Sequence, residues 1–205
     1  MGSSITSSFL AKWDRLRNRI YTALLSGSFA RCARGSRISP PLRFSNLHQV
    51  SLAESVIIHS DCWIGVVSSP DSDNSVRLTV GPHSAIGMGA TISAAESIVL
   101  EEHVLLARNV YISDHGHAYE DISRPIMAQG ISRPAPVRIG RHTWLGQNVV
   151  VLPGVTIGEH CVIGANSVVR NSIPAFSVAV GIPARVVKTY NKETSRWDKP
   201  AGGTA

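Results

Sequence analysis

The sequence predicts an all-β solenoid, because residues 139–174 repeat a pattern six residues long. An aliphatic residue opens each hexad: Ile139, Leu145, Val151, Ile157, Ile163 and Val169. The fifth place of each hexad is small or aliphatic and lies two residues before the next opener, so both side chains point to one side of an extended chain. Glycine follows several openers, where a bending chain favours a residue without Cβ: Gly140, Gly146, Gly158 and Gly164. Each hexad is therefore a short strand plus a corner, and successive corners close a coil.

The same period continues upstream in a less regular form. Aliphatic residues keep the six-residue step in two runs, Leu52, Ile58 and Ile64, then Val80, Ile86 and Ile92. A polar segment at 68–74, typical of a surface loop, separates the two runs. The next step, from Ile92 to Leu100, is eight residues, so two residues are inserted near Glu96. An unpaired carboxylate in an apolar core is costly, and we therefore expect the insertion to turn Glu96 outward.

The N-terminal segment has a helical pattern. Its apolar residues fall on one face of a helix: Phe9, Trp13, Leu16, Ile20 and Leu24. Basic residues occupy much of the remaining surface: Lys12, Arg15, Arg17 and Arg19. The preferred interpretation is a helix that caps the open end of the solenoid. The alternative is a helix that lies on an anionic membrane leaflet, and both can hold together.

Length and composition predict one domain with attached ends. The chain has 205 residues, and 43% of them are hydrophobic, which is enough for a continuous core. We expect three segments: a tail and basic amphipathic helix at 1–37, the solenoid at 38–187 with a loop at 113–138, and a short helix with a disordered tail at 188–205. The net charge of +6 favours anionic partners, but aromatic residues are only 6% and no nucleic-acid-binding module is recognisable, so nucleic acid is not an expected partner.

The cysteines and apolar runs predict a cytoplasmic location. The three cysteines form no CxxC pair, which is typical of a reducing compartment. Cys161 takes an inward place in its hexad and is expected to be a core residue, not a nucleophile. The apolar runs are too short to span a membrane, and no signal peptide is recognisable. Peripheral binding to the inner membrane through the basic helix stays open.

The repeat resembles that of the hexapeptide-repeat, or left-handed β-helix, acyltransferases. Over about residues 86–197 it resembles the bacterial O-antigen and capsule sugar O-acetyltransferases, which share the order of three motifs: D-H-G-H at 114–117, W-L-G at 144–146 and G-I-P-A-R at 181–185. The resemblance implies a left-handed parallel β-helix and a homotrimer with the active site between subunits. It also implies acetyl-CoA as donor. The implied acceptor is a sugar hydroxyl of a surface polysaccharide or of its precursor, and a lipid-linked precursor is one of the forms it can take.

The reaction needs a base that takes a proton from the attacking hydroxyl, and an imidazole can do this near neutral pH. The resemblance places this base at His115, with His117 as a competitor, and implies direct attack without an acyl-enzyme. Asp114, Tyr119 and Glu120 are candidates to orient the imidazole, and the sequence does not rank them. Tyr119 and Glu120, with Glu96, are also the candidates to contact the acceptor.

The resemblance also assigns a donor site. Trp144, Gly146 and Ala165 are expected to line the groove for the pantetheine arm. The phosphate partners are expected to be cations, through charge-assisted hydrogen bonds: Arg170, Arg185 and Lys188. Galactoside-type relatives carry acidic acceptor-binding residues where Ala94 and Ala95 stand here, so the acceptor sugar stays open.

Two other enzyme classes share the fold, and so would a purely structural solenoid, which has no need of a histidine-bearing insertion. One is a zinc enzyme similar to the γ-class carbonic anhydrases, although the histidine spacing of that class is not seen, and no metal site is expected. The other is a nucleotide-sugar N-acetyltransferase, which usually carries an additional N-terminal domain. Metal content and an acceptor panel discriminate between these alternatives and the O-acetyltransferase.

Overall fold

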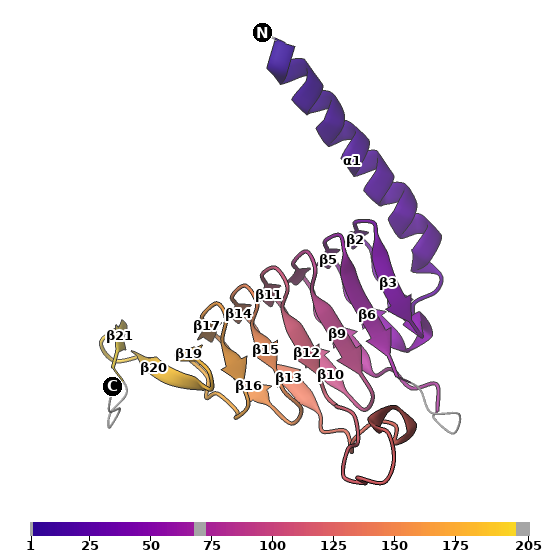
Figure 1. The fold of residues 1–205 in the computed structure, drawn as a ribbon. Coiled ribbons are helices and arrows are strands. Elements are labelled where there is room, and N and C mark those ends of the chain that lie inside the picture. Colours follow the sequence, from indigo (N-terminus) through magenta and orange to yellow (C-terminus); the bar gives the residue numbers. More distant parts are fainter. Residues whose placement is uncertain (1, 68–72, 200–205) are drawn as a thin grey trace.

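The structure is a computed structural model that describes residues 2–67 and 73–199, with side chains from residue 9 onward. Its strands wind into a solenoid of three parallel sheets, with helix α1 (Gly2–Ser26) at one end and an antiparallel hairpin at the other (Figure 1). The predicted disorder at 200–205, and most of the predicted loop at 68–74, lie outside the described residues.

Successive strands pass from the first sheet to the second and then to the third. Sheet A contains β1 (Arg31–Cys32), β4 (Val50–Leu52), β7 (Leu78–Val80), β10 (Ile98–Leu100), β13 (Val137–Ile139) and β16 (Thr156–Ile157). Sheet B contains β2 (Arg37–Ile38), β5 (Ile57–Ile58), β8 (Ala85–Ile86), β11 (Leu105–Leu106), β14 (Trp144–Leu145), β17 (Val162–Ile163), β19 (Ser177–Gly181), β20 (Ala184–Asn191) and β21 (Arg196–Asp198). Sheet C contains β3 (Leu42–Ser45), β6 (Cys62–Val66), β9 (Thr91–Ala94), β12 (Tyr111–Ser113), β15 (Val150–Val151) and β18 (Val168–Val169). Two short 3-10 helices, η1 (Leu47–Gln49) and η2 (Ile126–Ala128), lie in connections.

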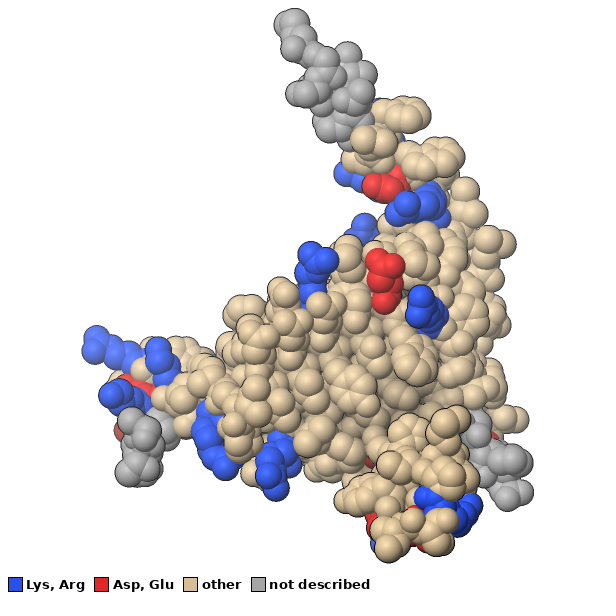
Figure 2. All heavy atoms as spheres, viewed as in Figure 1, with Lys and Arg blue, Asp and Glu red and all other residues tan. Residues whose placement is uncertain are grey.

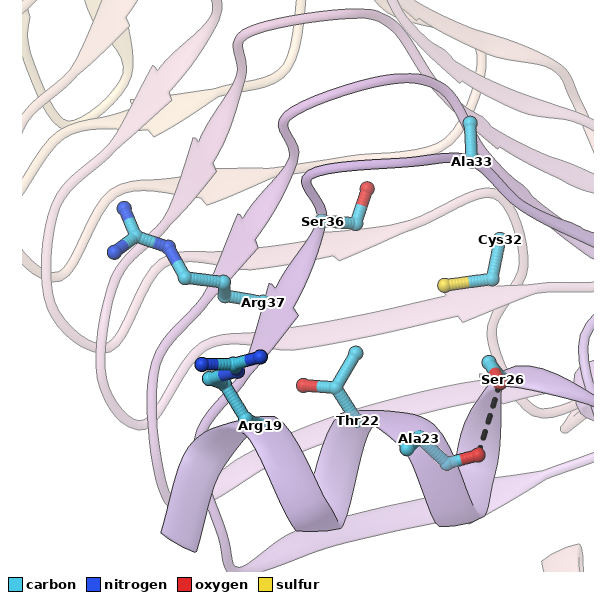
Figure 3. A pocket seen from close by; sticks show the side chains of 8 residues that line it. All are labelled: Arg19, Thr22, Ala23, Ser26, Cys32, Ala33, Ser36 and Arg37. Atoms are coloured by element: carbon cyan, nitrogen blue, oxygen red, sulfur yellow. Dashed lines mark hydrogen bonds between the residues drawn. The ribbon is translucent and has the colours of Figure 1, made fainter. Parts of the chain in front are cut away.

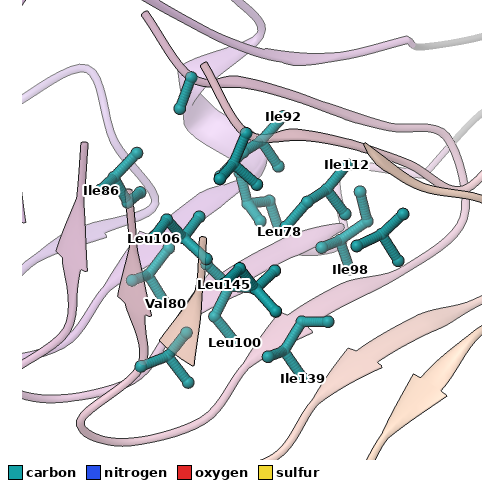
Figure 4. Close-up of a cluster of buried hydrophobic side chains, with 14 of the residues drawn as sticks. Leu78, Val80, Ile86, Ile92, Ile98, Leu100, Leu106, Ile112, Ile139 and Leu145 are labelled. Atoms are coloured by element: carbon teal, nitrogen blue, oxygen red, sulfur yellow. The ribbon is translucent and has the colours of Figure 1, made fainter. Parts of the chain in front are cut away.

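The hexad openers form the core, as the period predicts. Ile139, Leu145 and Ile163 are fully buried, and so are the upstream openers Ile58 and Ile92. Figure 4 shows Ile92, Ile139 and Leu145 among the aliphatic side chains gathered between the sheets. Equivalent openers lie in register on neighbouring coils, since Leu106 pairs with Leu145 and Leu145 pairs with Ile163. Glu96 is exposed, which confirms that the insertion turns it outward.

One corner of each coil, between sheets A and B, holds a residue with positive φ. In successive coils these corners carry His83, His103, His142, His160 and Phe176, with φ between 52° and 60°. Neighbouring rings stack with centroids 4.5–5.3 Å apart. The histidines are exposed, but they also cover each other's ring faces along this edge. The corner geometry thus repeats as regularly as the core.

Helix α1 contacts the first coil with a different face from the one that the sequence favours. Its C-terminal half packs Tyr21 and Leu25 against the core, and the Thr22 hydroxyl accepts a hydrogen bond from the backbone N–H of Ile38 at 2.8 Å. The helix thus contacts the end of the solenoid, as a cap does, but the apolar face predicted from the sequence stays exposed. The helix also begins at Gly2, where a loose tail is predicted, and the first strand begins at Arg31, before residue 38. No helix in the described part of the chain is long and apolar enough to cross a membrane.

The predicted short helix after residue 188 is absent from the described residues. β20 and β21 form a hairpin there instead, and β20 pairs antiparallel with β19. Two causes favour the strand: Val186, Val187 and Thr189 are β-branched, and β19 offers an unpaired edge at the end of sheet B. The Asn191 side chain accepts hydrogen bonds from two backbone N–H groups of the turn, which fixes the reversal.

Neighbouring coils approach so closely at Gly140 that a side chain there is expected to disturb the fold. A Cβ on Gly140 would lie 2.5 Å from backbone atoms of Gly158 and Glu159, whereas a Cβ on Gly27 meets nothing within 4 Å. Gly140→Ala is therefore expected to destabilise the fold by about 1–3 kcal/mol, as overpacking does, and Gly27→Ala to leave it unchanged or slightly more stable. Thermal unfolding of both variants measures this. Equal melting temperatures would contradict the packing of these two coils.

Candidate active site

The only long excursion within the coils from β7 to β18 lies between β12 and β13, at the corner where sheet C passes to sheet A. The loop begins at Asp114, whose carbonyl oxygen accepts a hydrogen bond from the Ala135 N–H at 2.8 Å. Further out, His117 and Ile131 form an antiparallel bridge. The Ser132 hydroxyl accepts a hydrogen bond from the Gly116 N–H at 2.9 Å. These bonds hold together the two ends of the polar, proline-rich insert. The candidate catalytic residues Asp114 and His115 lie at its beginning.

Asp114 is a fully buried carboxylate with partners at both oxygens. The backbone N–H groups of Ala95, Glu96 and Ser97 each donate to it at 2.8 Å. These three donors lie in the eight-residue step between Ile92 and Leu100, so the lengthened step forms a cradle of N–H groups. A buried carboxylate that receives several charge-assisted hydrogen bonds is held in place and needs no cation.

His115 takes the remaining position on this carboxylate. Its Nδ1 lies 2.8 Å from Asp114 Oδ1, and its side chain is 10% exposed. Because the three backbone N–H groups make the carboxylate an acceptor, we assign the imidazole proton to Nδ1. The Ser113 hydroxyl donates to the His115 carbonyl oxygen at 2.7 Å and so restrains the backbone beside the ring. In a neutral ring with its proton on Nδ1, Nε2 carries the lone pair that a general base requires.

The other loop candidates are placed differently. His117 is exposed, and Tyr119 is 67% exposed. Glu120 accepts a hydrogen bond from the Tyr119 N–H and so contacts its own loop backbone, not the imidazole. Glu96 contributes its N–H to Asp114 while its side chain is exposed. Geometry therefore ranks Asp114 first among the residues predicted to orient His115.

Three of the six predicted donor-binding residues, Trp144, Arg185 and Lys188, lie on strands of sheet B. Exposed Trp144 on β14 pairs in register with Val162, which pairs with Val178, which pairs with exposed Lys188 on β20. Residues in register point to the same side of a sheet, so these four side chains form a row on the outer face. The row spans about 14 Å at the usual strand spacing, with an aromatic ring at one end and a cation at the other.

The remaining donor candidates flank this face. Gly146 and Ala165 lie beside each other where sheet B passes to sheet C, and a Cβ on Gly146 would lie 2.7 Å from the Ala165 N. Arg185 is exposed on β20. Arg170 lies elsewhere: it directly follows Val169, in the coil position of Ser113, two strands along sheet C. Arg170 is therefore on the same corner as the loop of His115, about 10 Å further along the axis.

The two groups of predicted site residues are not brought together within one chain. Three sheets close a three-sided prism, and the corner between sheets C and A is opposite sheet B. His115 lies at that corner, whereas Trp144 and Lys188 lie on the opposite side. A single chain thus holds a candidate base and a candidate donor face that point away from each other.

The cysteines offer no nucleophile near these residues. Cys62 and Cys161 are fully buried, and burial raises the pKa of the Cys62 thiol to about 11 and also raises the pKa of Cys161. A high pKa leaves little thiolate, the reactive form, near neutral pH. The prediction that Cys161 is a core residue is confirmed. Within the described residues, no group of three or more histidine, cysteine or acidic side chains is arranged to hold a metal ion.

Sequence reasoning missed the structural partners of the candidate base. Ser113 and Ser132 anchor the loop through their hydroxyls, and Ala95 and Ser97 act through backbone N–H groups. The sequence does contain a signal for these backbone donors, which is the eight-residue step from Ile92 to Leu100. An insertion in a regular coil frees N–H groups from the strand ladder.

Comparison with known proteins finds relatives that are named as acetyltransferases. The family model described as "Bacterial transferase hexapeptide (six repeats)" matches residues 136–171. The chain is 43% identical over 114 residues, 53% of its length, to the putative lipopolysaccharide biosynthesis O-acetyl transferase WbbJ of Escherichia coli K12. It is 37% identical over 204 residues, 95% of its length, to the probable acetyltransferase Rv3034c of Mycobacterium tuberculosis H37Rv. The alignments span 58% and 66% of those relatives, less than two thirds of each.

A solved structure of galactoside acetyltransferase in complex with coenzyme A is also similar. It has a TM-score of 0.56 and 26% identity, over 83% of this chain and 70% of that chain. The hexad repeat and the three parallel sheets, together with the likeness to this structure, identify a left-handed parallel β-helix, as predicted. Residues 136–171 of the chain carry the repeat of the hexapeptide transferases, and the chain is similar to acetyltransferases over most of its length.

The cradle around Asp114 predicts a stability effect that is independent of catalysis. Asp114→Asn replaces one acceptor oxygen with an NH₂ group that faces a backbone N–H donor, so buried donors lose their partner. We expect a loss of about 1–3 kcal/mol and faster amide exchange at 95–97. Thermal unfolding and hydrogen exchange measure both, with Glu120→Gln as an exposed control. Unchanged protection of these amides would show that Asp114 does not hold them.

Proposed function

We propose that this protein is an acetyl-CoA-dependent O-acetyltransferase that acts on a sugar hydroxyl of a surface polysaccharide or its precursor. The observation that carries the proposal is the Asp114–His115 pair, with Nδ1 bound to a fully satisfied carboxylate and Nε2 free. In such an imidazole Nδ1 is held by the carboxylate, and Nε2 is available to accept a proton. The relative named for lipopolysaccharide biosynthesis supports the acceptor class, and the coenzyme A complex of the galactoside enzyme supports the donor.

In the proposed reaction, the sugar hydroxyl binds at Nε2 of His115. Its oxygen attacks the thioester carbonyl carbon while its proton passes to Nε2. The tetrahedral intermediate collapses to the acetylated sugar and the coenzyme A thiolate, which takes the proton back from the imidazolium. Asp114 keeps the ring in one tautomer and stabilises the imidazolium during this cycle. Both buried thiols lie outside this sequence, so no acyl-enzyme forms on them.

The donor site is proposed on sheet B and its flank. The row from Trp144 to Lys188 offers apolar surface for the pantetheine arm and a cation at its end for phosphate. Arg185 adds a second cation nearby, and Gly146 with Ala165 leaves the backbone accessible at the corner. Arg170 would meet the donor from the corner that carries His115.

The separation of base and donor face supports a homotrimer. If each copy presents the His115 corner to the sheet B face of the next copy, cyclic symmetry completes three equal sites. We therefore propose a trimer in which His115 comes from one copy and Trp144 from its neighbour. The free, sparse cysteines support a cytoplasmic location.

Removing the base tests the function directly. His115→Ala is expected to lower kcat by about 10²- to 10⁴-fold, the usual contribution of a positioned general base, with little change in coenzyme A binding. Release of free coenzyme A thiol reports turnover on a panel of sugars, lipid-linked glycans and nucleotide-linked amino sugars, so the N-acetyltransferase alternative is tested in the same assay. His117→Ala is the matched control. Full activity in His115→Ala would refute the assignment of the base.

Mixing inactive variants tests the composite site. His115→Ala and the double variant Trp144→Ala/Lys188→Glu each spoil every site of a homotrimer. Co-expressed in equal amounts, they form mixed trimers in which one site in three receives both intact halves, so about a quarter of wild-type activity is expected. Wild type co-expressed with His115→Ala calibrates the mixing. Activity no higher than that of the separate variants, despite mixed trimers, would place the whole site within one chain.

A further inference from the structure

Helix α1 carries an apolar stripe that the rest of the chain leaves exposed. Five side chains form the stripe and are 50–75% exposed: Phe9, Trp13, Leu16, Ile20 and Leu24. A shallow hollow of about 210 Å³ runs along it, lined by apolar side chains and Arg17. Figure 1 shows the helix extending away from the solenoid, so this surface is accessible along the length of the helix. Contiguous exposed apolar surface of this kind marks an interaction site.

The stripe faces away from the solenoid. The residues that contact the first coil are Asn18, Tyr21, Thr22 and Leu25. At 100° per residue these lie around the opposite side of the helix from the stripe. No movement that keeps these contacts can fold the stripe onto the body of its own chain. Its occupant must therefore come from outside the chain.

A second copy of the helix is a poor occupant, because of the charges beside the stripe. Phe9, Trp13, Leu16 and Ile20 have the 4-3-4 spacing of coiled-coil core positions, which puts Lys12 at a g position and Arg17 at an e position. In a parallel pair of identical helices these two face each other across the seam, and like charges there are repulsive. The same positive charges favour binding of the stripe to a negatively charged surface.

Basic side chains lie on both flanks of the stripe. Lys12 and Arg19 lie on one flank and Arg17 on the other, and the one acidic side chain in the described helix, Asp14, is 3.2 Å from Arg17. Figure 2 shows the charged atoms on the visible side of the helix. Arg19 also lines a hollow of about 230 Å³ between the helix and the first coil, opposite Arg37 (Figure 3). Neither Arg19 nor Arg37 has an ion-pair partner among the described residues.

We propose that helix α1 docks on an anionic lipid surface, with the stripe inserted at the level of the headgroups and the flanking cations on the lipid phosphates. Aromatic and aliphatic side chains on one face with basic flanks are the features of helices that lie in the membrane interface. Each cation near such a surface adds to the attraction. Docking itself does not depend on the proposed function. If that function holds, docking brings the enzyme to a lipid-linked acceptor.

Vesicle co-sedimentation of the full chain tests the proposal. Wild type should bind phosphatidylcholine vesicles with about 30% phosphatidylglycerol and should bind pure phosphatidylcholine much more weakly, and added salt should weaken the binding. Trp13→Glu should lower partitioning by at least about tenfold. Ala11→Glu adds the same charge on the opposite, exposed face and should keep most of the binding. Equal loss in both variants, or equal binding to both vesicles, would overturn the proposal.

Two further readouts separate the other outcomes. The oligomeric state of Trp13→Glu, measured by light scattering, should equal that of wild type. A smaller oligomer with unchanged vesicle binding would assign the stripe to contacts between copies and would refute lipid docking. Turnover of Trp13→Glu with a water-soluble acceptor should be unchanged. Failure of lipid docking is thus distinguishable from failure of the transferase assignment, since each is read in its own assay.

Discussion

The stacking of coils in strict register is the constraint on which the rest of this structure depends. Each short strand is hydrogen-bonded to the strands above and below it, and each coil buries its aliphatic openers against the next, as Leu106, Leu145 and Ile163 do. A two-residue strand is too short to be stable alone, so the repetition supplies the stability. Any residue inserted into a coil must leave this lattice, and the insertions are therefore where new chemistry can be placed.

Two insertions in neighbouring coils act together at one corner. The shorter one, between Ile92 and Leu100, frees three N–H groups, and the longer one, after Ser113, begins with the carboxylate that these groups bind. The carboxylate in turn holds the imidazole of His115. The candidate base is thus positioned by the backbone of the adjacent coil. A rigid scaffold that carries the functional residue on a loop anchored at its base is a common solution for positioning reactive groups.

The sequence predicts the solenoid well because one period determines both the direction of the side chains and the corners. It predicts the ends poorly, since the end elements respond to contacts that the period does not describe. β20 is a strand because β19 offers it an edge, and the amphipathic pattern of α1 defines two faces without saying which one Tyr21 and Thr22 will attach to the first coil. In the site, the pair Asp114 and His115 is visible in the sequence. The cradle is not, because a backbone N–H is present whatever side chain the residue carries.

The three-sided shape also determines which surfaces of the molecule can share one site. A prism cannot place a corner and its opposite face in one pocket, so the proposed site, with His115 on the corner and Trp144 on the face, requires two copies to meet. The exposed stripe of α1 lies outside this arrangement, at the end of the prism axis. A lipid surface at that end leaves the three side faces free for contacts between copies. Association through the sides and docking through the end therefore do not compete, and one short repeat can support both.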